Sequence, residues 1–115
     1  MFAVIYRFRL RPEQESTYIK AWNIVADYFI QQRGALGSCL HKSENTIWVA
    51  YSRWTDRSTR DAAWPGDGEP HVDIPTDVRE AIAQIQKIKK QNIDLEQYDE
   101  ICMDVVEDKL ISGKI

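Results

Sequence analysis

The stretch that decides the fold is TIWVAYSRW, residues 46–54. Its β-branched and aromatic residues predict a strand, because such side chains pack well on a pleated, half-buried surface. Successive side chains of a strand point to opposite faces of its sheet, so this strand presents apolar groups on both. The first face carries Ile47, Val49 and Tyr51, and the second carries Trp48, Ala50 and Trp54. Both faces are therefore expected to be buried.

Upstream of this stretch, the sequence predicts a second strand over 38–43, joined to it by a tight turn at 44–45. Alternating large apolar residues over 2–10 predict the first strand. A helix is expected between them, beginning near Pro12 and ending at Gly34. Its apolar stripe recurs every three or four residues: Tyr18, Ile19, Trp22, Val25, Ala26, Phe29 and Ile30.

Downstream, Thr55 and Asp56 can cap a short helix that runs to about Trp64 and is broken by residues 65–68. A longer helix opens at Pro75, and its stripe includes Val78, Ile82 and Ile85. Residues 98–109 are expected to form the last strand, followed by a tail over 110–115.

The resulting order, β-α-β-β-α-β, predicts an α+β domain of the ferredoxin-like split kind over residues 1–115. Short connections and right-handed crossovers favour a four-stranded antiparallel sheet of order 4-1-3-2 with its helices on one face. The other face is also apolar in strands three and four, so we expect a second copy to cover it as a homodimer. Arg7 and Arg9 lie on the first strand and are expected to pair with Glu100 or Asp104.

Composition excludes several classes of partner. The net charge is −3 with both signs interspersed, which argues against binding to nucleic acid or to an anionic membrane. No apolar run is long enough to span a bilayer, and the start of the chain lacks a basic leader. The two cysteines are expected to be reduced thiols in a cytoplasmic protein. The sequence contains no metal-binding spacing and no phosphate-binding glycine loop.

Several features occur together in an order and spacing typical of one family. They are the helix end Arg33-Gly34-Ala35-Leu36-Gly37-Ser38, the strand end Tyr51-Ser52-Arg53-Trp54-Thr55-Asp56, Trp64 ten residues later, and the pair Pro70-His71. In these features the chain resembles the antibiotic-biosynthesis-monooxygenase-like group of the dimeric α/β barrel superfamily. The resemblance implies oxygenation of a small planar aromatic or a quinol without a cofactor.

His71 and Trp64 are the predicted catalytic residues. An imidazole titrates near neutral pH, so His71 could remove a phenolic proton, and Trp64 could stack on a planar substrate. Tyr6, Trp22, Tyr51 and Arg53 are the predicted substrate-binding residues, with Arg53 suited to a carboxylate or carbonyl. Each also has a plain structural interpretation, as a core aromatic, a surface arginine or, for His71, a partly solvated loop histidine.

The sequence is also compatible with other functions. The same fold hosts non-catalytic ligand-binding or stress-related dimers, and isomerases or decarboxylases of similar substrates. Heme-degrading relatives are a further alternative, in which Trp64 and His71 would stand for the family's tryptophan and heme ligand. Those enzymes also use an Asn on the first strand, and no Asn occurs over residues 1–10.

Overall fold

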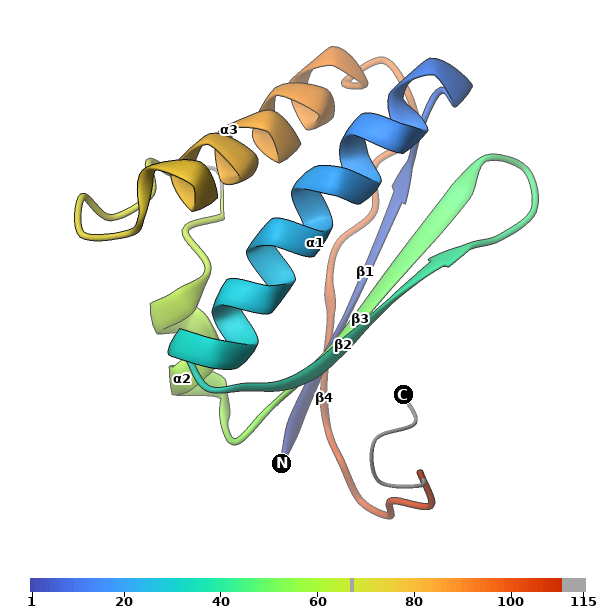
Figure 1. Cartoon of the computed structure of the whole chain (residues 1–115). Coiled ribbons are helices and arrows are strands. Elements are labelled where there is room, and N and C mark those ends of the chain that lie inside the picture. Colours follow the sequence, from blue (N-terminus) through green and yellow to red (C-terminus); the bar gives the residue numbers. More distant parts are fainter. Residues whose placement is uncertain (67, 111–115) are drawn as a thin grey trace.

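In the computed structural model, which describes residues 1–66 and 68–110, strands and helices follow the predicted order (Figure 1). The elements are β1 (Phe2–Arg9), a 3-10 turn η1 (Pro12–Gln14), α1 (Glu15–Gln32), β2 (Ala35–Lys42), β3 (Ile47–Trp54), α2 (Arg57–Ala63), α3 (Thr76–Gln91) and β4 (Ile101–Asp104). None of the helices within the described residues is long and apolar enough to cross a membrane.

The four strands form one antiparallel sheet in the order β2-β3-β1-β4, which confirms the predicted topology. β1 and β3 are the central pair and stay in register from Phe2 opposite Trp54 to Arg9 opposite Ile47. The helices lie together on one face of this sheet, and the opposite face carries no helix (Figure 1). The predicted ferredoxin-like α+β fold is therefore confirmed.

The core lies between the helices and the sheet. Val4 of β1 and Ile82 of α3 are completely buried, and Trp54 is 2% exposed. Phe29 of α1 packs against the rings of Trp54 and Trp64, with centroid distances of 5.9 and 6.1 Å. Large aromatic side chains thus hold α1 against both β3 and the end of α2.

Two details of the predicted first helix differ from the structure. Ile19 and Ile30 are 39% and 44% exposed, so they lie at the edge of the stripe and not in the core. Ala21 is buried in their place, because only a small side chain fits where α1 lies close to its neighbours.

The last strand is much shorter than predicted, at four residues. The register explains its end: Asp104 lies opposite Phe2, and the Val105 amide donates to the Met1 carbonyl, beyond which β1 offers no further partner. The second strand, in contrast, begins earlier than predicted, at Ala35, with an irregularity between Ala35 and Gly37. Of the predicted tail, residues 111–115 lie outside the described residues.

The predicted pairing of the β1 arginines is wrong. Arg7 and Arg9 lie on the helix-free face, whereas Glu100 points to the helix side, where Arg60 binds it. Strand alternation is the cause, because Ile101 lies opposite Ile5 on the helix-free face and its neighbour Glu100 faces the other way. Arg9 instead pairs with Glu96 at 3.2 Å, and Arg7 stacks on the ring of Tyr98 at 5.1 Å.

Shortening one buried side chain in the apolar stripe of α3 tests how tightly the core is packed. Ile82→Ala should lower the free energy of unfolding by about 2–5 kcal/mol, because it leaves a cavity in a fully packed site. Ile93→Ala, at a position 70% exposed, should change it by less than about 0.5 kcal/mol. Urea unfolding measures both, and equal losses in the two variants would contradict the packing described.

Candidate functional site

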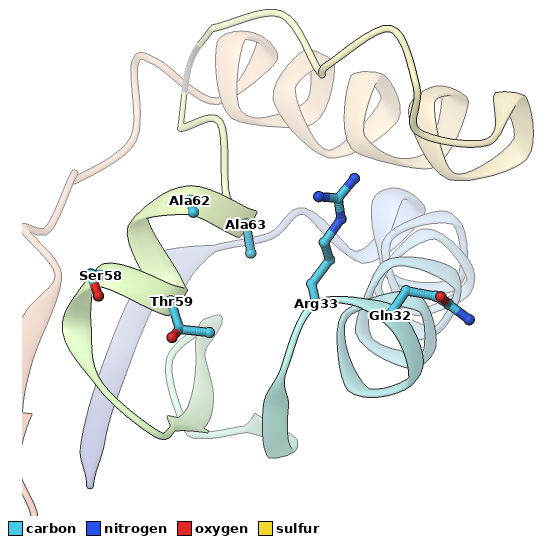
Figure 2. Close-up of a pocket in the computed structure, with 6 residues that line it drawn as sticks. All are labelled: Gln32, Arg33, Ser58, Thr59, Ala62 and Ala63. Carbon is cyan, nitrogen blue, oxygen red and sulfur yellow. The ribbon is translucent and has the colours of Figure 1, made fainter.

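A hollow of about 460 Å³ lies where the end of α1 faces α2. Its lining combines small and polar side chains: Gln32, Arg33, Ser58, Thr59, Ala62 and Ala63. In Figure 2, Thr59 and Ala63 point from α2 toward the end of α1, where Arg33 extends beside them. The hollow is large enough for a small planar molecule, since ligand sites generally begin at about 300 Å³.

Local sequence signals fix the two walls of this hollow. Asp56 caps α2, accepting hydrogen bonds from the Thr59 amide at 2.8 Å and from the hydroxyls of Ser58 and Thr59 at 2.9 and 2.7 Å. The hydrogen bonds from Thr59 and Ser58 lower the pKa of the Asp56 carboxyl. Gly34 ends α1 with φ +82°, and a Cβ there would lie 3.1 Å from Thr59 Cγ2. Glycine therefore lets the chain turn close against α2.

A chain of polar contacts leads from Arg33 to His71. Arg33 Nε donates to the Tyr28 hydroxyl at 3.1 Å, and Arg33 Nη2 lies 3.6 Å from an Asp73 carboxylate oxygen. The same carboxylate oxygen binds His71 Nδ1 at 2.5 Å. The hydrogen bond from His71 is the main cause that lowers the pKa of Asp73, with Arg33 adding to it.

This pairing has a consequence for the imidazole. A carboxylate only accepts hydrogen bonds, so His71 Nδ1 is the donor in this pair. The His71 side chain is 73% exposed, lies outside the lining of the hollow and connects to it through Asp73 and Arg33. The arrangement orients an imidazole beside a carboxylate, which suits it to exchange a proton with a molecule that covers it.

The two predicted pocket tryptophans lie in different parts of the core. Trp64 follows α2 and is half-buried, with its ring edge against Phe29. Trp22 of α1 packs instead against a second cluster formed by Leu10, Tyr18, Trp48 and Ile88. Trp64 is therefore the one that stands close to the hollow, next to its lining residue Ala63.

Tyr6 faces the helices and contacts a residue that sequence reasoning missed. Arg60 of α2 is 5% exposed and donates from Nη1 to the Tyr6 hydroxyl at 3.1 Å. Both Arg60 Nη atoms also bind the Glu100 carboxylate, at 2.8 and 2.7 Å. Burial raises the pKa of Tyr6, and the hydrogen bond from Arg60 lowers the pKa of Glu100. No local pattern marks Arg60, because its burial depends on β4 from the far end of the chain.

Tyr51 and Arg53 lie on the other face of the sheet. They line a groove of about 580 Å³ between the helix-free face and residues 105–110. Arg53 is 7% exposed and pairs with Asp108 at 2.8 Å. The sheet therefore separates these two predicted substrate-binding residues from Tyr6, Trp22 and Trp64, and the six predicted residues do not line one pocket. Within the described part of the chain, no group of three metal-ligating side chains occurs.

Comparison with known proteins identifies the family of this chain. The model of the antibiotic biosynthesis monooxygenase family matches residues 1–64, which span β1 to the end of α2. The chain belongs to this family. The matched part includes Arg33 and α2 of the hollow as well as Tyr6, Tyr51, Arg53 and Trp64. A search of curated proteins found no match.

Several solved structures share the fold of this chain over nearly their whole length. Rv0793 from Mycobacterium tuberculosis is 15% identical, with a TM-score of 0.63, covering 95% of this chain and 98% of its own. A candidate antibiotic biosynthesis monooxygenase from Chloroflexus aurantiacus is 16% identical, with a TM-score of 0.65 and coverage of 96% and 97%. One from Deinococcus radiodurans is 13% identical, with a TM-score of 0.63 and coverage of 98% and 100%. At such low identity the likeness concerns the fold alone.

The pair formed by the buried Arg60 guanidinium and the partly exposed Glu100 carboxylate gives a pH-dependent prediction. Because the native pKa of Glu100 is lowered, its contribution to stability is complete above its ordinary value of 4.5 and is lost as pH falls through the native value. At pH 7, Glu100→Gln should therefore be less stable than the wild type by about 1–3 kcal/mol. Urea unfolding at several pH values should show this gap closing below about pH 4.5. A gap that does not change between pH 7 and pH 3 would contradict the pairing.

Proposed function

We propose that this family member is a cofactor-independent monooxygenase of a small phenol or quinol, which binds at the hollow between α1 and α2. The Arg33–Asp73–His71 chain, which leads from the hollow to the surface beside it, is the observation that carries the proposal. It combines an imidazole oriented by a carboxylate, which can act as a general base, with a guanidinium that can stabilise an anionic substrate oxygen. Membership of the antibiotic biosynthesis monooxygenase family supports the reaction class.

The proposed reaction uses the substrate itself as reductant. His71 Nε2 takes the phenolic proton, and Arg33 stabilises the phenolate that results. The phenolate transfers one electron to dioxygen, and the radical pair combines to form a carbon–oxygen bond. The peroxide then receives a proton from the imidazolium. Loss of the ring C–H proton breaks the O–O bond and releases a carbonyl product and water. Trp64, beside the hollow, would contact one face of the planar ring.

The proposal involves no heme. The set of residues that the heme-degrading relatives use is incomplete here, because β1 contains no Asn. His71 lies on the surface beyond the hollow, bound to Asp73.

Oxygen consumption with a panel of quinols and polycyclic phenols tests the assignment. The wild type should consume oxygen with at least one of them, and His71→Ala should lower kcat/KM by about 100-fold or more, because general-base catalysis typically contributes that much. Asp73→Asn should cause a smaller loss by releasing the imidazole. Asp77→Asn, an exposed carboxylate in the first turn of α3, is the matched control and should keep full activity.

Two results would overturn this function. If His71→Ala consumed oxygen as fast as the wild type, His71 would not be the general base. Substrate binding by tryptophan fluorescence without oxygen consumption would favour a non-catalytic ligand-binding dimer. One observation supports that second function: the Ser58 and Thr59 hydroxyls in the hollow already bond to Asp56, so fewer groups are left to act on a substrate.

We also propose that two copies pair through their helix-free faces, in the cytoplasm, where both free cysteines, Cys39 and Cys102, would stay reduced. That face presents a continuous set of half-buried apolar side chains from all four strands: Ile5, Cys39, Val49, Tyr51 and Met103, with Ile101 38% exposed. Apolar patches of this kind are rarely left uncovered on a monomer.

A charge placed in the centre of this face tests the homodimer. By size-exclusion chromatography with light scattering, the wild type should show twice the mass of one chain, and Val49→Asp should show the mass of a monomer, because an unpaired carboxylate cannot be buried at the interface. Val72→Asp, at a position 79% exposed in the loop before α3, should leave the dimer intact. A monomeric wild type would refute the pairing.

A further inference from the structure

Arg60 is an unusual residue because its charge is almost fully buried. Its side chain lies between α2, β1 and β4, 5% exposed, with the guanidinium 5.9 Å from the ring centre of Phe2. The Asp61 carboxylate comes within 2.9 Å of Arg60 Nε, but it lies outside the hydrogen-bonding direction, so this buried N–H has no hydrogen-bond partner. A buried charge requires strong compensation, which here comes from the hydrogen-bonded Glu100 carboxylate and from the nearby charge of Asp61.

The compensating carboxylate is held much less firmly than the guanidinium. Glu100 follows the irregular segment between α3 and β4, and its side chain is 39% exposed. It can therefore rotate into water, whereas Arg60 is fixed by the packing of α2. If the Glu100 side chain rotates away, three groups still surround the position of its carboxylate: both Nη atoms of Arg60 and the Tyr6 hydroxyl. Cys102 Sγ lies 3.6 Å from Nη2.

This set of groups has a clear chemical preference. A guanidinium presents two parallel N–H groups that match the two oxygens of a carboxylate, as Glu100 shows here with distances of 2.8 and 2.7 Å. The neighbouring Tyr6 hydroxyl can donate a third hydrogen bond, since among the described residues its contact is with Arg60, which only donates. The rings of Phe2 and Tyr6 would contact the apolar part of a bound acid.

We propose that Arg60 and Tyr6 form a binding site for the carboxylate of a small organic acid, and that Glu100 occupies this site as an internal ligand in the free protein. The site goes beyond the proposed oxygenase function and does not depend on it. Ser58, Thr59, Ala62 and Ala63 of α2 line the hollow, whereas Arg60 projects from the same helix toward β1 and β4. A ligand here would bind on the opposite side of α2 and would displace Glu100.

Chemical rescue of Glu100→Ala tests this site. The variant should be less stable than the wild type in chloride, because Arg60 loses its partner. Acetate at about 100 mM, compared with chloride at equal ionic strength, should raise its Tm by roughly 5 °C and saturate. The wild type should show a much smaller acetate-specific rise, because acetate must first displace Glu100 there. If the variant is unfolded in chloride, acetate should restore its circular dichroism spectrum.

Two further variants and a second anion complete the design. Glu96→Ala removes the carboxylate that pairs with Arg9, whose side chain is 22% exposed, and it should show no acetate effect. Glu100→Ala combined with Arg60→Leu should lose the effect entirely. Absence of an acetate-specific rise in Glu100→Ala, or an equal rise in sulfate, would overturn the proposal. Because the readout is stability, these results do not depend on whether the protein consumes oxygen.

Discussion

The structure depends on one constraint: the central strands β1 and β3 carry apolar side chains on both faces, so both faces need cover. On one face, Val4 and Trp54 are buried against α1 and α3. On the other, Ile5 and Val49 are half-buried and line a groove together with residues 105–110. A single layer of helices cannot satisfy a sheet of this kind, and a second copy is the economical way to complete it.

The short helix α2 contributes side chains both to the core and to the two proposed sites. Asp56 fixes its start, Trp64 and Phe29 hold its end against α1, and its two sides then face different surroundings. Toward α1 it lines a hollow connected to His71 through Arg33 and Asp73. Toward β1 and β4 it places Arg60 in the core. The two proposed sites would therefore lie on opposite sides of a helix of seven residues.

The sequence predicted the fold well because periodicity is a local signal that burial reinforces. Strand alternation around Val49 and the stripe around Val25 predicted the elements, and their order predicted the sheet. Where prediction failed, the cause was distant in the chain: β4 ends because β1 begins at Phe2, and Glu100 meets Arg60 and not Arg7 because of the register between β1 and β4. The site was predictable only as residue types, since no local pattern tells which face of the sheet Tyr6 or Tyr51 takes, nor that Asp73 would bind His71.

The most direct test of the central constraint is an isotope-filtered NOE experiment on a mixture of ¹³C-labelled and unlabelled chains. Contacts between copies should appear at the methyl groups of Ile5, Val49 and Met103 on the helix-free face, and none should appear at Ile82 beneath the helices. Intermolecular contacts at the helix layer, or none at all with the helix-free methyls in contact with water, would contradict the account that a second copy covers this sheet.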